Sequence, residues 1–173
     1  MRRICYSVAA SLDGYVAGPN GEADWISADP EIDFQALFAR FDTLLMGRKT
    51  YEAAAGHGSG GAMPGVRTVV VSRSLRPSDN PAVTVINENV EAEVARLRAT
   101  GGKDIWLFGG GSLFACLLAA GLVDSVEVAV MPVLLGGGIP LLPPPVARTS
   151  LALTSHKVYK SGIVSLDYAV ARR

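Results

Sequence analysis

The chain of 173 residues has the length expected for one domain with its own hydrophobic core. Hydrophobic residues make up 49% and charged residues 18%, which excludes a disordered or linker-like protein. Sixteen Lys and Arg balance sixteen Asp and Glu, so no net field draws the chain to nucleic acid or to an anionic membrane, and we expect neither as a partner.

Strand and helix patterns alternate through the first two thirds of the chain. The first helix is expected to have Asp29 as its N-cap and Pro30 at its first position, and Gly56 to Gly65 is predicted as a loop. Strands are predicted over 4–11, 43–46, 68–71, 83–86 and 105–108, with 15–17 continuing the first strand, and helices over 31–41, 49–55, 90–99 and 112–120.

The last third has strands without helices between them. They are predicted over 126–133, 151–159 and 163–170, with a long Gly- and Pro-rich loop at 134–145 and a hairpin connection at 160–162. The chain is therefore predicted to be a single α/β domain over 1–173, in which a mostly parallel sheet ends in an antiparallel C-terminal edge.

Cysteine and histidine placement points away from a metal site. Cys5 and Cys116 lie in apolar surroundings without paired spacing, which is typical of small core residues in a reducing compartment. His57 and His156 are far apart, so no metal is expected. The apolar run after Met1 stops at a turn signal and resembles a core strand more than a signal peptide, so we expect a cytoplasmic protein.

Two glycine-centred segments each follow a predicted strand and open a predicted helix. Gly47-Arg48-Lys49-Thr50 combines a flexible glycine with two cations and a hydroxyl, and Gly109-Gly110-Gly111-Ser112 places three glycines in series. Backbone N–H groups at such turns favour phosphate. Neither segment matches the Walker or the G-x-G-x-x-G pattern, and an ordinary strand–helix junction remains the alternative for each.

Ser72-Arg73 ends another predicted strand. A hydroxyl beside a guanidinium suits a monoester phosphate such as the 2′-phosphate of NADPH, although a strand that simply ends in polar residues explains the pair equally well. All three segments lie at the carboxyl ends of predicted strands, where open α/β sheets bind ligands.

The motifs, taken in order, resemble the dihydrofolate reductase-like superfamily, and most closely the reductase (C-terminal) domain of the bifunctional riboflavin-biosynthesis deaminase-reductase. The segments that carry the resemblance are Ser11-Leu12-Asp13-Gly14, Met46-Gly47-Arg48-Lys49-Thr50-Tyr51, Val71-Ser72-Arg73, Phe108-Gly109-Gly110-Gly111-Ser112 and Pro132-Val133-Leu134-Leu135-Gly136. The resemblance implies a sheet of about eight strands with helices on both faces, a homodimer, and an NADPH-dependent reductase that transfers hydride to an imine-like C=N carbon. Such an enzyme would be similar to 5-amino-6-(5-phosphoribosylamino)uracil reductase.

The resemblance also implies roles for individual residues, all of them toward NADPH. Residues 13–21 would form a loop that closes over the reacting centre. The nicotinamide would be lined by Ala9 and Ala10, and the 2′-phosphate would be bound by Ser72 and Arg73. The pyrophosphate and adjoining ribose would be bound by Gly47, Arg48, Lys49 and Thr50. Support for the pyrophosphate and nicotinamide ribose from the other side would come from Gly109, Gly110, Gly111, Ser112 and Leu113.

The proton donor and the substrate stay open. Dihydrofolate reductases carry an acidic residue on their first helix, and counting back from Gly47 places Glu31 and Asp33 near that position. Both residues could equally serve only to favour the first helical turn. Riboflavin-pathway reductases continue their Gly-x-x-Thr element with Asp-x-Pro, whereas Thr50 here leads into Tyr51-Glu52-Ala53. The substrate can therefore be another heterocycle or a carbonyl compound. Two alternative functions also stay open, a dihydrofolate reductase acting on a pterin and a non-catalytic NADPH-binding protein.

Overall fold

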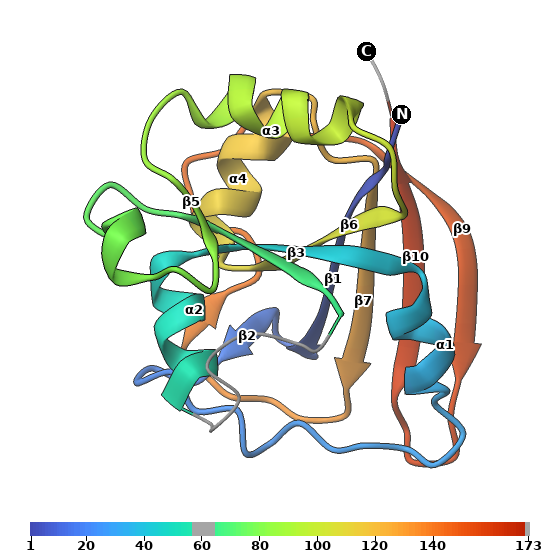
Figure 1. Cartoon of the computed structure of the whole chain (residues 1–173). Coiled ribbons are helices and arrows are strands. Elements are labelled where there is room, and N and C mark those ends of the chain that lie inside the picture. The colour runs from blue at the N-terminus through green and yellow to red at the C-terminus, as the bar shows by residue number, and fades with distance from the viewer. Residues whose placement is uncertain (57–64, 172–173) are drawn as a thin grey trace.

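The computed structural model describes residues 1–56 and 65–171 and contains one eight-stranded sheet. Its strands are β1 (Ile4–Ser11), β3 (Phe41–Gly47), β4 (Arg67–Val71), β5 (Thr84–Ile86), β6 (Asp104–Gly109), β7 (Ser125–Met131), β9 (Leu151–Val158) and β10 (Val164–Val170). The order is β5-β4-β3-β6-β1-β7-β10-β9 (Figure 1). All neighbours from β5 to β7 pair in parallel, and the β7–β10 and β10–β9 pairs are antiparallel, which confirms the predicted architecture.

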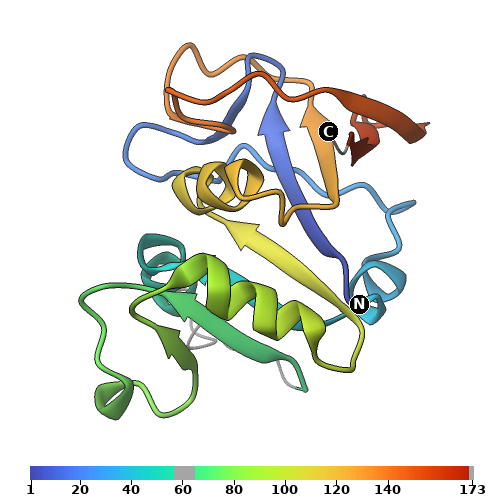
Figure 2. The same cartoon turned by 90° about the horizontal axis from the view of Figure 1, so that it is seen from above.

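Helices cover both faces of this sheet (Figure 2). The helices are α1 (Phe34–Ala39), α2 (Arg48–Ala54), α3 (Val90–Ala99) and α4 (Gly111–Ala119), with a 3-10 turn, η2 (Pro77–Asp79). The larger core lies on one face, where Val94 and Leu97 of α3 join Leu117 of α4. On the other face, Leu37 of α1 and Tyr51 of α2 pack against a smaller cluster. The short helices α1 and α2 cover only part of this face, and a cavity lies beside α1.

The first helix is shorter than predicted and begins at Phe34 instead of residue 31. Its N-cap is Asp33, whose side chain accepts a hydrogen bond from Ala36 N at 2.8 Å. Asp29, the predicted cap, is buried, and its carboxylate accepts from Glu31 N at 2.8 Å and from Ser161 N at 3.1 Å. Asp29 is bound to the β9–β10 connection, and it begins a separate turn in which its carbonyl accepts from Ile32 N at 3.0 Å, rather than starting the helix.

Residues 15–17 do not continue the first strand. They form β2 (Tyr15–Ala17), which pairs with β8 (Ile139–Pro140) in a separate two-stranded sheet. The Asp13 carboxylate reinforces this contact by accepting from Leu135 N at 3.1 Å and Gly136 N at 2.7 Å. The long Gly- and Pro-rich loop is therefore joined to the segment after β1.

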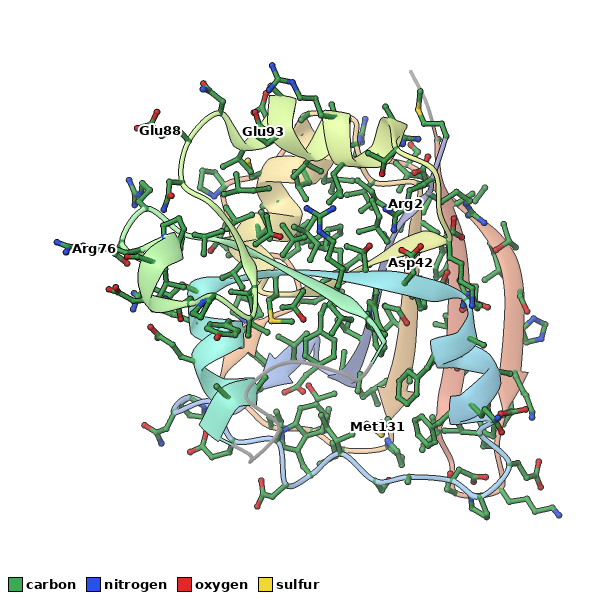
Figure 3. All side chains as sticks on the ribbon, in the orientation of Figure 1. Arg2, Asp42, Arg76, Glu88, Glu93 and Met131 are labelled. Atoms are coloured by element: carbon green, nitrogen blue, oxygen red, sulfur yellow. The ribbon has the colours of Figure 1, made fainter. Side chains whose placement is uncertain are left out.

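Arg2 joins the amino ends of the central strands, away from the glycine segments. It is buried and donates to Thr43 Oγ1 at 2.7 Å and Thr100 Oγ1 at 3.3 Å, and it also pairs with Asp42, beside which it lies in Figure 3. Since each donor is matched by a local acceptor, this cluster stabilises the sheet.

Cys5 is buried as predicted, whereas the prediction of a core position for Cys116 is wrong, because α4 turns Leu113, Phe114 and Leu117 toward the core instead. The predicted loop from Gly56 to Gly65, with His57, lies largely outside the described residues. Over residues 1–56 and 65–171, no helix is long and apolar enough to cross a membrane, and no three His, Cys, Asp or Glu side chains group as metal ligands.

Candidate active site

The segments after β3, β4 and β6 meet at one edge of the sheet. These strands are parallel neighbours, and their register pairs Gly47 with Val71 and Met46 with Gly109. Ser72-Arg73 therefore follows β4 at the same level at which the two glycine segments leave β3 and β6. The structure brings together all three segments that the sequence proposed as phosphate contacts.

The two glycine segments are close to each other across this edge. A Cβ atom at Gly110 would lie 3.4 Å from Thr50 Oγ1, one at Gly109 would lie 3.5 Å from the same atom, and one at Gly47 would lie 3.8 Å from Gly110 N. Gly109 also has φ +138°, a conformation that favours glycine. The segments therefore form a cradle of bare backbone, with Thr50 as its nearest hydroxyl.

Gly111 has a different role from its two neighbours. A Cβ atom there would lie 2.8 Å from Pro143 Cδ and 3.1 Å from the Pro140 carbonyl oxygen. Its missing side chain is needed for α4 to pack against the 140–143 loop. Of the two residues that follow, Ser112 is exposed and Leu113 is buried in the core, so Leu113 supports the cradle from behind.

The polar residues of the three segments differ in exposure and in the contacts that they make. Arg48 pairs with Glu52 at 3.0 Å on the surface of α2, while Lys49 is exposed. The Ser72 hydroxyl is buried and accepts from Ser74 N at 3.2 Å and Leu75 N at 3.0 Å, so it shapes the turn after β4. Arg73 is exposed.

A cavity of about 460 Å³ lies on the sheet face beside α1. Its floor consists of two rows of side chains that run across β1, β7 and β10. One row is Ala9, Ala129 and Ser165, and the other is Ser7, Glu127 and Asp167. Small side chains in the first row leave the space open. Ala9 faces this space, whereas Ala10 is buried, as expected for its alternate position in the strand.

An aromatic wall connects the cavity with the glycine cradle. The Phe34 and Phe38 rings lie 6.1 Å apart, Phe38 lies 5.5 Å from Trp106, and Trp106 lies 5.2 Å from Phe108, which directly precedes Gly109. Trp106 is held in place because its Nε1 donates to the Ser7 carbonyl at 2.8 Å. Stacked and edge-on rings of this kind suit a planar ligand.

Glu31 and Asp33, the predicted acids, both line this cavity. Each carboxylate already has a structural contact, because Glu31 pairs with Lys160 Nζ at 3.2 Å and Asp33 caps α1. Their role as proton donors stays a prediction.

Sequence reasoning missed a charged group at the floor of the cavity. Arg40 donates to both oxygens of Glu127, at 2.9 and 2.7 Å, and Ser125 Oγ donates to Glu127 Oε1 at 3.1 Å. Asp167 lies directly across from Glu127 on the neighbouring strand. Burial raises the pKa of Asp167, the Glu127 charge raises it further, and Arg40 opposes the rise. The sequence signal that could have revealed this group is a carboxylate within each of two apolar strands, Glu127 in β7 and Asp167 in β10.

The strand order, the cradle at the strand ends and the cavity beside α1 define a protein of the dihydrofolate reductase-like class. The chain belongs to the RibD C-terminal domain family, whose model matches residues 2–165. It is 35% identical over 178 residues to the uncharacterized Bacillus subtilis protein YyaP, covering 96% of this chain and 94% of YyaP.

Two solved structures illustrate the same fold. A Shewanella sp. PV-4 protein assigned to riboflavin biosynthesis superimposes with a TM-score of 0.84 at 26% identity, covering 99% of this chain and all of the other. A dihydrofolate reductase from Enterococcus faecalis, complexed with NADP(H) and RAB-propyl, gives a TM-score of 0.68 at 16% identity, covering 98% of this chain and 97% of the enzyme. The second likeness establishes the shared fold.

Proposed function

We propose that this protein is an NADPH-dependent reductase that transfers hydride to the C=N carbon of a planar heterocycle or of a ring-opened sugar amine. One observation carries the proposal: the glycine cradle and the cavity lie side by side. Tyr6 pairs with Leu107, so continuing this parallel register places Ala9 level with Gly110. A cofactor held at the cradle would therefore extend its reactive end toward the cavity floor.

The residues of the cradle fit a dinucleotide. Gly47, Thr50, Gly109 and Gly110 offer close backbone approach for the pyrophosphate, because no Cβ atom occupies the space between β3 and β6. When bound, NADPH supplies the hydride. Arg73 is the exposed cation that we propose for the 2′-phosphate, while the buried Ser72 hydroxyl shapes the turn that presents it.

The cavity supports the proposed class of substrate. Its volume of about 460 Å³ suits a small ring system, its wall is aromatic, and its floor carries hydrogen-bonding groups at one end. Membership of the RibD C-terminal domain family favours an aminopyrimidine carrying a sugar amine, and a dihydropterin would place a similar ring against the same wall.

Cofactor binding is the first test. We expect a fluorescence titration to show tighter binding of NADPH than of NADH. Arg73→Ala should weaken NADPH binding about 10- to 100-fold, since a contact to a charged group contributes about 1.5–3 kcal/mol, and should leave NADH binding unchanged. Arg76→Ala is the matched control, because Arg76 is an exposed arginine on the same turn, directed away from the fold in Figure 3. Equal affinity for the two cofactors in the wild-type protein would contradict the proposal.

Turnover is the second test. NADPH oxidation should be followed with 5-amino-6-ribosylaminouracil, 7,8-dihydropterin and 3,4-dihydroisoquinoline, which represent the sugar amine, the pterin and a simple cyclic imine. Oxidation with the first or the third but not with the pterin supports the C=N reductase. Tight NADPH binding without any oxidation would instead support a non-catalytic binding protein.

We also propose that two copies of the chain associate through β9. This strand forms one edge of the sheet, and all eight of its residues are exposed. Leu153 is 53% exposed and Val158 is 68% exposed. An uncovered edge strand with apolar side chains is a ready surface for pairing with a second copy.

A further inference from the structure

The carboxyl groups at the floor of the cavity are placed by the sheet. Ser7, Glu127 and Asp167 occupy one cross-strand row, and the strand register fixes all three on the face that lines the cavity. In an antiparallel pair, directly opposite side chains have Cβ atoms about 4.5–5.5 Å apart. The Glu127 and Asp167 carboxyl groups are therefore close neighbours.

Glu127 is the member of this pair whose carboxyl group has an arginine and a hydroxyl as partners. Arg40 binds both of its oxygens in a forked arrangement, at 2.9 and 2.7 Å, and the Ser125 hydroxyl adds a third hydrogen bond. Bidentate contacts between arginine and carboxylate are among the strongest hydrogen bonds in proteins. Both oxygens of Glu127 are thus occupied, and the side chain is only 10% exposed.

Asp167 is in the opposite situation. No described residue donates a hydrogen bond to its carboxyl group, which lies between the sheet and the cavity. Burial raises its pKa first, and the neighbouring Glu127 charge raises it second, against the opposing effect of Arg40. The neutral form of Asp167 is favoured for this reason.

The other titratable groups around the cavity do not give Asp167 a cation of its own. On β9, Lys157 Nζ donates to the Glu31 carbonyl at 3.4 Å and lies 4.4 Å from the centre of the Tyr159 ring. The groups that face the cavity or the neighbouring row are Glu127 on β7, Arg40 after α1, Lys157 on β9, Glu31 and Asp33 before α1, and the buried Cys5 on β1.

We propose that Asp167 is the proton donor of the cavity, and that Glu127, clamped by Arg40, is the positioning residue beside it. The proposal rests on the proposed C=N reduction. Asp167 faces the open floor with its carboxyl uncommitted, whereas Glu31 and Asp33 are engaged by Lys160 and by the N-terminus of α1. This geometry favours the strand carboxyl over the two helix carboxyls.

In the proposed step, hydride from NADPH adds to the carbon of the C=N bond, and the electron pair of that bond moves to nitrogen. The O–H bond of Asp167 then breaks, and the proton forms an N–H bond with that nitrogen. The substrate is reduced to CH–NH, NADPH is oxidised to NADP⁺, and Asp167 is left as a carboxylate. A proton from water restores its neutral form before the next turnover.

The first experiment needs no substrate. In a carbon-13 NMR titration of aspartate-labelled protein without cofactor, the Asp167 signal is assigned by its loss in Asp167→Asn. We expect it to titrate above the ordinary range of an aspartate carboxyl group. Glu127→Gln should move the Asp167 titration to lower pH, because a like charge is lost and Arg40 remains. Glu93→Gln on α3 is the matched control and should leave it unchanged.

The second experiment measures turnover of 5-amino-6-ribosylaminouracil and 3,4-dihydroisoquinoline across pH. We expect Asp167→Asn to lower kcat by about 100-fold or more, as for loss of a general acid, and to remove the decline of the wild-type rate toward high pH. The dissociation constant of NADPH should change by less than about twofold, because Asp167 lies in the cavity and not in the cradle.

Failure of this inference can be distinguished from failure of the proposed function. Titration of Asp167 together with exposed aspartates, or no response to Glu127→Gln, would overturn the inference whether or not the protein binds NADPH. Loss of the high-pH decline in Asp33→Asn, but not in Asp167→Asn, would also overturn it. Absence of NADPH binding or of any C=N reduction in the wild-type protein would contradict the proposed function, and the titration would still decide the protonation state of Asp167.

Discussion

The ion pair between Arg40 and Glu127 offers a quantitative test of how much the floor of the cavity contributes to stability. The pair joins the end of α1 to the middle of β7, 87 positions apart in the chain. Arg40→Met keeps most of the side-chain volume and removes the charge, and Glu127→Gln keeps the shape. Together with the double variant, these substitutions form a double-mutant cycle.

The exposure of the two side chains sets the expected magnitude. Arg40 is 40% exposed and Glu127 is 10% exposed. Removing one partner of a fully buried pair costs about 3–5 kcal/mol, whereas a fully exposed pair contributes about 0–1 kcal/mol. This half-buried pair lies between these limits. We therefore expect Arg40→Met to lower the free energy of unfolding by about 2 kcal/mol, with a coupling energy of about 1–2 kcal/mol.

The assay is urea unfolding at neutral pH, repeated at low and high salt. Arg96→Met is the matched control, because Arg96 pairs with Glu93 on the surface of α3 and is 76% exposed. This control should cost less than about 0.5 kcal/mol and lose its effect at high salt, whereas the Arg40 effect should persist. A coupling energy near zero, or equal costs for the two arginine variants, would refute the reasoning.

Three further predictions concern the elements around the site. Hydrogen bonding, chiefly from Ser161, lowers the pKa of Asp29. The contribution of Asp29 to the free energy of unfolding is therefore fully present above the ordinary carboxyl pKa and is lost as the pH falls through the lowered pKa. Asp29→Asn should therefore unfold with a weaker dependence on acid pH in urea titrations; an unchanged slope contradicts this. Gly138 has φ +149°, and a Cβ atom there would lie 2.2 Å from the Ala17 carbonyl oxygen. Gly138→Ala should therefore lower the melting temperature by an amount equivalent to about 2–3 kcal/mol. An unchanged melting temperature would contradict the close β2–β8 contact. Leu153→Lys should convert the proposed dimer to a monomer in light scattering without loss of thermal stability; a monomeric wild-type protein would contradict the proposal.

Local patterns were sufficient for two elements that end close to a strong local signal. The helix at 90–99 was predicted with the bounds that the structure has, because Gly101-Gly102 follows just after its C-cap, Thr100. The strand at 4–11 was also predicted with its observed bounds, because Asp13-Gly14 makes the chain turn. Where a side chain has a distant partner, the local pattern failed. Asp29 is of a residue type that often caps helices, but its carboxylate accepts a hydrogen bond from Ser161 N in the β9–β10 connection, which gives it another role.

The sequence by itself determined the alternation of strands and helices, the antiparallel end of the sheet and the positions of the glycine segments. It also implied that these segments meet, because the carboxyl ends of parallel strands share one edge. The cavity floor was decided only by the tertiary structure. Arg40, Glu127 and Asp167 come from three distant parts of the chain. Strand register pairs the two carboxyl groups, and the position of α1 on the sheet brings Arg40 to Glu127. Register is a property of paired strands, so no pattern within a single strand can specify which carboxyl groups become neighbours.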